Sequence, residues 1–190
     1  MNFKPWIGER YEKRELFGLR ILLLGESHYG EPGEENEDFT IDVVRHWGQQ
    51  ARHSFFTITA KFLLRKGAGE WLSDDDRSDF WEKVAFYNYI QELVGSDSRI
   101  RPTSKMWQNA RSSFLSLCDE LKPELIVVLG KELCWNLREI PGEYPYCCVR
   151  HPSSGFSYEK EMPILLEAIA KAQKAFNNQI KPTPKSGAAY

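Results

Sequence analysis

Four short apolar runs, separated by segments with helical patterns, constrain the fold of this 190-residue chain more than any other feature. The runs are RILLL (Arg20–Leu24), KVAFY (Lys83–Tyr87), ELIVVL (Glu124–Leu129) and YCCV (Tyr146–Val149). Apolar runs of this length are typical of the buried strands of a parallel sheet. Strands that alternate with helices predict helices on both faces of the sheet. We therefore expect an α/β fold, a three-layer αβα sandwich with a central, mainly parallel sheet of four strands.

The segments between these runs carry the signals of helix starts and ends. Thr40 to Lys66 has mixed helical periodicity, and we expect Gly67 to end that helix. Ser73, with Asp76 three residues later, has the pattern of a capping box. The remaining helices are expected from Thr103 or Ser104 to Pro123, from Lys131 to Pro141 and Gly142, and over Tyr158–Ala175.

Composition indicates one globular domain without a membrane-spanning segment. Hydrophobic residues make up 42% of the chain and charged residues 27%, and no stretch approaches the ~18 apolar residues that a span needs. The first residues, MNFKPWIGER, lack the apolar run of a secretory signal. We expect a single domain over residues 1–176, a flexible polar tail over residues 177–190 and a cytoplasmic location.

The cysteine pattern argues against a metal site, and the net charge argues against strong nucleic-acid binding. Cys118, Cys134, Cys147 and Cys148 form no C-x-x-C pair, so we expect buried free thiols rather than a metal site or a disulfide framework. No metal and no redox cofactor is expected. The net charge of −2 and the pI of about 6.1 are not those of a strong nucleic-acid binder, which is usually basic. A basic face would have to be local.

Polar residues follow the ends of all four expected strands. In open parallel sheets, ligands bind outside the carboxyl ends of the strands, where helix N-termini also point. The residues that reach this edge are Gly25, Glu26, Ser27, His28 and Tyr29 after the first strand, Asn88 after the second, Gly130 and Lys131 after the third, and Arg150, His151 and Ser153 after the fourth. The sequence therefore predicts a polar pocket at this edge.

Three of these side chains suit the recognition and release of a nucleobase. Asn88 offers one acceptor and two donors to a pyrimidine edge. His151 can donate to an oxygen that gains negative charge as a bond breaks, and Glu26 can orient or activate a water as a general base. Each also has a structural reading. Asn88 would then be a turn residue, His151 a structural histidine before proline, and Glu26 a helix-terminal charge or a member of a surface ion pair.

These residues resemble the motifs of the uracil-DNA glycosylase superfamily. GESHYG (Gly25–Gly30) is similar to the family's first motif, with forms such as GQDPYH or GEAPG, and VAFYN ends in an asparagine at Asn88 as the second motif does. KPELIVVLGKELCWNL is similar to the strand and helix before the last motif, and HPSSGFSY from His151 to that HPS motif itself. The pieces occur in the family's order over roughly residues 20–158.

The resemblance implies roles for the edge residues. It makes His151 the residue that stabilises the departing base anion, and Asn88 the residue that reads the base. Ser27 stands where the family usually has a water-positioning Asp or Asn, so Glu26 would supply that charge, as in the GEAPG form. The remaining implied roles are base contact by Gly25, His28, Tyr29 and Phe39, with Phe55 as a rival of Phe39 for base stacking, and DNA contact by Ser153, Ser154, Phe156, Lys131 and Arg150.

Three functional hypotheses remain open at this point. The first is a DNA glycosylase that hydrolyses the N-glycosidic bond of uracil or a related damaged base. The second is a protein of the same fold that binds a base, a nucleotide or nucleic acid without cleaving it, which Ser27 and the acidic pI favour. The third is an interaction protein in which the pocket is vestigial.

Overall fold

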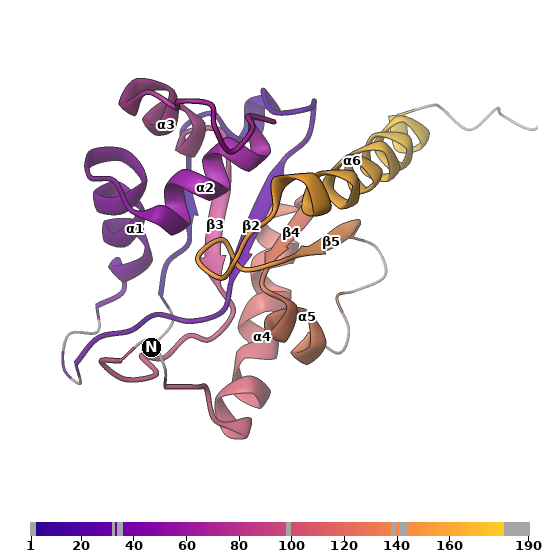
Figure 1. The fold of residues 1–190 in the computed structure, drawn as a ribbon. Helices are drawn as coiled ribbons and strands as arrows, with labels where there is room; N and C mark the ends of the chain where they lie inside the picture. The colour runs from indigo at the N-terminus through magenta and orange to yellow at the C-terminus, as the bar shows by residue number, and fades with distance from the viewer. Residues whose placement is uncertain are drawn as a thin grey trace, which may run out of the picture.

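A computed structural model of the chain describes residues 3–31, 33, 36–97, 100–137, 140 and 144–180. It shows an α/β fold built on one mixed sheet (Figure 1). The strands of this sheet are β1 (Trp6–Ile7), β2 (Ile21–Gly25), β3 (Ala85–Asn88), β4 (Leu125–Leu129) and β5 (Tyr146–Val149). They lie in the order β1-β3-β2-β4-β5.

The four expected strands are confirmed as β2 to β5, and they pair in parallel. The expected number of four strands is wrong, because β1 adds a fifth strand that runs antiparallel to β3. A strand of two residues gives no period-2 pattern to recognise. Its position is fixed instead by tertiary contacts, since the indole of Trp6 donates to the carbonyl oxygen of Trp81 at 2.8 Å. Gly8 follows β1 in sequence and packs against the backbone of Glu82. A Cβ atom at position 8 would lie 2.4 Å from the Glu82 backbone.

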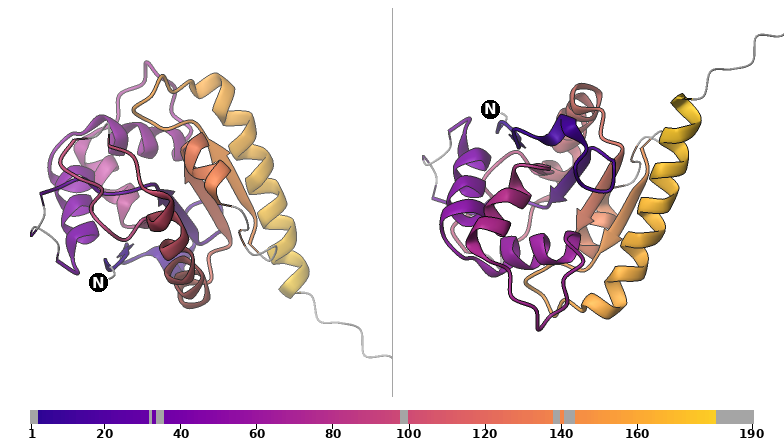
Figure 2. Two further views of the ribbon diagram at one scale, coloured as in Figure 1. Left: turned by 90° about the horizontal axis from the view of Figure 1, so that it is seen from below. Right: turned by 90° about the horizontal axis from the view of Figure 1, so that it is seen from above.

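The helices cover the sheet on two faces. They are α1 (Phe39–Val43), α2 (Ser54–Leu63), α3 (Asp74–Trp81), α4 (Ser104–Leu121), α5 (Lys131–Asn136) and α6 (Tyr158–Ile180), with short segments η1 (Tyr11–Lys13) and η2 (Val44–Gln50). A first core joins α2, α3 and α6 to alternate strand residues such as Leu23 and Val127. A second core joins α4 and α5 to the intervening residues, such as Leu22 and Val128. Figure 2 shows α6 running lengthwise beside the strands, and α4 lies across the sheet from it.

Two helix predictions need correction. The single helix expected from Thr40 to Lys66 is three segments, because η2 is a π-helix and Ala51 after it is extended (φ −103°, ψ 161°). The α2 helix ends at Leu63, and the left-handed residue beyond it is Arg65 (φ +56°) rather than Gly67.

The expected boundary between the domain and its C-terminal tail lies inside a helix. Residues 177–180, expected to belong to a flexible tail, are part of α6, which extends to Ile180. Residues 181–190 lie outside the described part of the chain, as do Pro141 and Gly142, which were expected to end α5.

The cysteine prediction was half right. Cys118 and Cys147 are buried free thiols, as expected. Cys134 of α5 and Cys148 of β5, however, form a disulfide with their Cα atoms 5.9 Å apart, a separation that a disulfide accommodates. The two cysteines are fourteen residues apart in the sequence. Only the packing of α5 on β5 brings the two thiols together.

A buried arginine holds the end of η2. Arg77 of α3 is fully buried, and its Nη1 donates to the carbonyl oxygens of Gly48 at 2.5 Å and Ala51 at 2.8 Å. Its Nη2 donates to the carbonyl oxygen of Gln49 at 3.2 Å and to Asp74 Oδ1 at 3.1 Å. These backbone carbonyls have left the helical ladder, so the guanidinium satisfies groups that would otherwise be buried without a partner.

Replacing Arg77 by methionine should lower the free energy of unfolding by about 3 kcal/mol or more, because several buried carbonyls lose their donor. Urea denaturation measures this loss. Arg45→Met is the matched control, since Arg45 is half exposed and its ion pair is with the exposed Asp42, and it should change the free energy by less than about 1 kcal/mol. Equal losses for the two variants would contradict the role given to Arg77.

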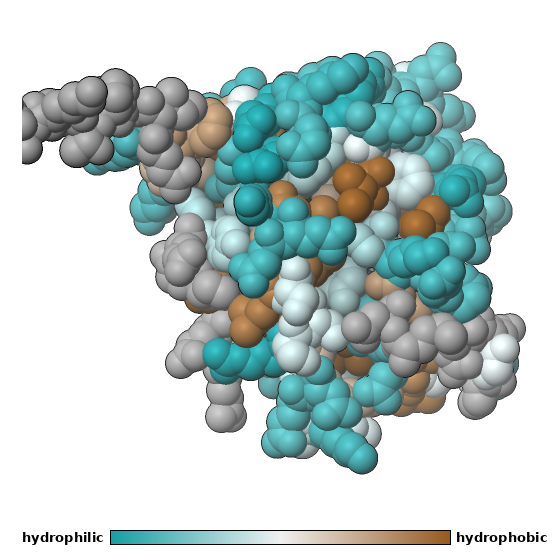
Figure 3. All heavy atoms as spheres, turned by 180° about the vertical axis from the view of Figure 1, so that it is seen from behind, coloured by the Kyte–Doolittle hydropathy of each residue, from teal (hydrophilic) through white to brown (hydrophobic). Residues whose placement is uncertain are grey.

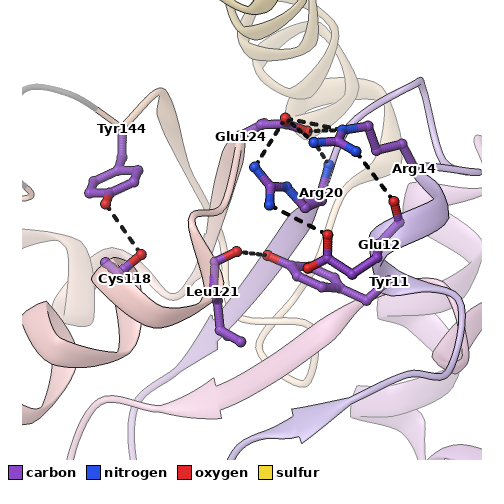
Figure 4. A network of polar contacts seen from close by, with 8 residues as sticks. All are labelled: Tyr11, Glu12, Arg14, Arg20, Cys118, Leu121, Glu124 and Tyr144. Carbon is purple, nitrogen blue, oxygen red and sulfur yellow. Dashed lines mark hydrogen bonds and ion pairs between the residues drawn. The ribbon is translucent and has the colours of Figure 1, made fainter.

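A second polar network fastens the amino ends of β2 and β4 (Figure 4). Glu124 precedes β4, and its carboxylate accepts from Arg14 Nε at 3.0 and 3.1 Å and from the backbone N–H of Arg20 at 2.8 Å. Burial opposes ionisation of Glu124, but the hydrogen bonds from Arg14 and from the Arg20 backbone hold its pKa below the usual range. The network therefore depends on an ionised Glu124.

Replacing Glu124 by glutamine should lower the free energy of unfolding by about 2 kcal/mol at pH 7, the range of hydrogen bonds to a charged group. The pKa of Glu124 is lower in the folded protein, so its contribution is present above the unfolded pKa of about 4.3 and is lost as the pH falls through the folded pKa. Thermal melts from neutral to acidic pH should show the difference between variant and parent shrinking. Glu12→Gln, at an exposed carboxylate that also contacts Arg20, should show little difference at any pH.

Candidate functional site

The candidate site lies at the carboxyl ends of the parallel strands. After β2 ends, the chain continues beside the segment that follows β3. The backbone N–H groups of Tyr89 and Ile90 donate to the carbonyl oxygens of Gly25 and Glu26, both at 2.9 Å. The residues that follow β2 and β3 are therefore held side by side, as expected for a parallel sheet.

Asn88 packs against Gly25, its partner in the β2–β3 register. A Cβ atom at position 25 would lie 2.1 Å from Asn88 Oδ1, so only glycine leaves room for this amide. Asn88 is 5% exposed, and the structure shows no hydrogen bond from its side-chain amide to any other described residue. The amide therefore keeps its acceptor and its two donors for a ligand that enters this edge.

His151 follows β5 and packs against Phe55 of α2, with 5.1 Å between the ring centroids and 38° between the planes. The backbone N–H of Ser153 donates to His151 Nδ1 at 3.2 Å. Burial lowers the pKa of His151, and the positive charge of Arg101 lowers it further. At neutral pH the ring is therefore uncharged, and because Nδ1 accepts, the proton is on Nε2.

Glu26 supplies the acid of the site. Its side chain is 13% exposed, and Arg101 Nη1 lies 3.4 Å from its Oε1. Burial raises the pKa of Glu26 and so does the negative charge of Glu132, whereas Arg101 lowers it. Arg101 also lies 3.5 Å from Glu132 Oε2. One guanidinium therefore acts on both titratable groups of the site, since it favours the carboxylate of Glu26 and the neutral form of His151.

The Asn88 amide and the His151 imidazole lie on one face of the sheet, and the Glu26 carboxyl lies on the other. Asn88 follows Phe86, which faces the first core and has its ring centroid 6.1 Å from that of Phe55. Glu26 follows Leu24, which faces the second core. Side chains alternate along a strand, so a residue two positions on points the same way. The three groups therefore approach one edge of the sheet from two sides.

Ser27, between Glu26 and His28, has a buried hydroxyl without a hydrogen-bond partner among the described residues. Its neighbours in sequence are placed quite differently. His28 is buried, and its Nε2 lies 2.8 Å from the hydroxyl of Thr40. Burial lowers the pKa of His28 to about 3, so its ring is neutral at physiological pH.

The structure does not bring Phe39 to Asn88 or His151. Its ring packs on His28, at 5.0 Å between centroids, and on Phe3, at 5.6 Å. Tyr29 packs against the second core. Phe55 is instead the aromatic ring beside His151.

The residues expected to contact DNA differ in their surroundings. The side chains of Ser153 and Ser154 are exposed, as is Arg150. Lys131 Nζ donates to the carbonyl oxygen of Cys148 at 2.5 Å and lies 3.7 Å from Glu161 Oε2.

Phe156 packs into the first core. Its ring lies against Phe62 of α2, with 5.0 Å between centroids, and against Tyr158, with 5.3 Å. The loop after β5 thus turns back over α2 (Figure 1).

Sequence reasoning missed Arg101. Nothing in its loop marks it, because a single arginine before a proline has no pattern of its own. Among the described residues, one pocket lies along α4 and one near the N-terminus, and neither is lined by Glu26, Asn88 or His151.

No protein-family model matches the sequence, and no curated protein is similar enough to it to count as a match.

Among the described residues, no helix combines the length and the apolar character needed to cross a bilayer. Nor do those residues contain a group of three or more His, Cys, Asp or Glu side chains able to hold a metal ion.

Replacing Arg101 by glutamine should move two pKa values upward. His151 loses a repelling positive charge, so its pKa rises toward the usual value of about 6.5. Glu26 loses an attracting charge, so its already raised pKa rises further. NMR titration of the imidazole and carboxyl signals measures both, and Arg150→Gln, next to His151 in sequence but not a cause of its shift, should change them less. A His151 pKa at or above 6.5 in the parent protein would contradict the site described.

Proposed function

We propose that the chain is a DNA glycosylase that hydrolyses the N-glycosidic bond of uracil or a related damaged base. The observation that carries this proposal is the placement of His151 at the strand-end edge, where the backbone N–H of Ser153 donates to its Nδ1. This contact leaves Nε2 as the ring nitrogen that can donate. A neutral N–H donor placed there suits an oxygen that becomes negative as a base departs. The helices on both faces of the sheet fit the three-layer αβα sandwich that the resemblance to uracil-DNA glycosylases implies.

The proposed reaction needs only the residues of this edge. The target base leaves the DNA stack and enters the site, where the free amide of Asn88 pairs with its edge. The bond between the base nitrogen and the sugar C1′ breaks, and its electron pair leaves with the base, whose carbonyl oxygen receives a hydrogen bond from His151 Nε2. A water attacks C1′ and gives its proton to Glu26.

The aromatic contact in this proposal comes from Phe55 rather than Phe39. The ring of Phe55 packs against His151 and also contacts the ring of Phe86. Phe86 is two residues before Asn88 in β3. A base between the imidazole and the amide would meet this ring. Ser153, Ser154 and Arg150 are exposed at the same loop and suit contacts to backbone phosphates. Phe156 would have to leave the first core to enter the DNA stack, so we do not assign it that role.

A second candidate is binding of a base or nucleotide without cleavage. The specific observation that favours it is the ion pair between Glu26 and Arg101. A carboxylate held by a guanidinium is a weaker base, because its ionised form is stabilised. In this alternative Asn88 and His151 still hold the base, and the difference between the two candidates lies in turnover alone.

The test uses single- and double-stranded oligonucleotides that contain uracil, hypoxanthine or xanthine, with abasic-site formation as the measurement. The parent protein should release at least one of these bases. His151→Ala should lower the single-turnover rate about 10²–10³-fold, the cost of one donor to a developing anion. Glu26→Gln should lower it by roughly 10²-fold or more.

The matched control is His46→Ala, at an exposed histidine on η2 that lies outside the site, and it should leave the rate unchanged. No release of any of the bases, together with binding that Asn88→Ala abolishes, would decide for the second candidate. Neither release nor binding by a folded protein would refute both.

A further inference from the structure

A pocket of about 440 Å³ lies along α4, apart from the strand-end site. Its wall is formed by Tyr89, Ser104, Trp107, Gln108, Arg111, Phe114, Asn136 and Leu137. They come from the segment after β3, from α4 and from the end of α5, and the two helices lie side by side in Figures 1 and 2. The volume is within the range of pockets that hold a small ligand.

Aromatic rings make up one side of this pocket. The rings of Tyr89 and Trp107 are 5.8 Å apart between centroids and only 33° from parallel. Phe114 lies behind them and contacts Tyr89 at 5.5 Å. Phe114 and Tyr89 are buried, whereas Trp107 is half-buried at the pocket rim. A planar ring is the shape that such a surface accepts, since stacking on aromatic side chains needs a flat partner.

Polar groups make up the other side. Ser104, Gln108 and Arg111 are exposed, and with Trp107 they follow the spacing of one helix face. Asn136 faces them from α5, where its Nδ2 donates to the carbonyl oxygen of Glu132 at 2.9 Å. The pocket thus offers a cation, two amides and a hydroxyl around its aromatic side.

The cation is close to the aromatic side. Arg111 and Tyr89 line the same pocket. Burial raises the pKa of Tyr89, and the positive charge of Arg111 lowers it. Ser104 is the first residue of α4, whose first-turn N–H groups and dipole add positive potential at this end of the pocket. Positive potential next to an aromatic surface suits a ligand with one flat and one anionic part.

We propose that this pocket binds a nucleotide unit, with its base on Tyr89 and Trp107 and its phosphate at Arg111. Gln108 and Asn136 hydrogen bond to the base or sugar. Arginine and the start of a helix are common partners of phosphate, and base stacking tolerates any of the four bases. Tyr89 directly follows Asn88, so the pocket begins where the strand-end site ends. The unit can be a free nucleotide or part of a nucleic-acid strand.

Calorimetric titration of the full chain with deoxyadenosine 5′-monophosphate and with single-stranded oligodeoxyadenylate tests the proposal. We expect at least one of them to bind. Trp107→Leu and Arg111→Gln should each weaken that binding by roughly tenfold, the usual effect of losing one stacking or phosphate contact. Deoxyadenosine and inorganic phosphate, titrated separately, should bind more weakly than the nucleotide that joins them.

Two controls match the test variants. Trp135→Leu removes an 82% exposed tryptophan of α5 that does not line the pocket, and Lys105→Gln removes an exposed charge of α4 on another face. Both should bind as the parent does. Circular dichroism melts confirm that each variant is folded.

The outcomes separate this proposal from the glycosylase proposal. Binding of the mononucleotide, weakened by Trp107→Leu but not by Asn88→Ala, supports the pocket and indicates a free nucleotide. Binding of the oligonucleotide alone, weakened in the same way, supports it and indicates a strand. Binding that only Asn88→Ala weakens, or no binding of either probe by the folded protein, overturns it, whatever the base-release assay shows.

Discussion

The pairing of β2 with β3 is the constraint on which the candidate site depends. Both strands are buried along their whole length, so neither has room for a polar side chain before its last residue. The register sets Gly25 opposite Asn88, and the missing Cβ of Gly25 leaves the space that the Asn88 amide fills. A shift of one residue would turn this amide into the second core, where the cost of burying it would forbid the pairing.

The parts of the structure that repeat a pattern could be predicted from the sequence. The four buried strands and the starts of α3 and α4, at Ser73 and Thr103, followed from apolar runs and capping residues. The features that the sequence did not predict depend on contacts between segments that are distant in the sequence. The strand at Trp6 is fixed by Trp81, and the break after η2 exists because Arg77 satisfies the carbonyls it exposes. Neither residue carries a local signal of that role.

The same distinction applies to the site. Strand ends and polar residue types were enough to bring Glu26, Asn88 and His151 to one edge of the sheet. They were not enough to say how the charges interact, because Arg101 reaches the edge from a loop without periodicity. Phe55 illustrates the same limit. Sequence distance favoured Phe39 for base stacking, but the ring of Phe39 is occupied by His28, and the break after η2 brings Phe55 to the imidazole.

The disulfide joins two of the elements that carry the site's charges. Cys148 lies in β5, which leads into His151, and Cys134 lies in α5, which carries Glu132, a cause of the raised pKa of Glu26. A covalent link between these elements limits how far His151 and Glu132 can move apart, since each is only a few residues from a bonded cysteine. Hydrogen bonds alone would hold α5 less firmly, because it is a short helix of six residues. The electrostatic balance of the edge therefore rests on the packing of α5 against β5 as much as on the residues that titrate.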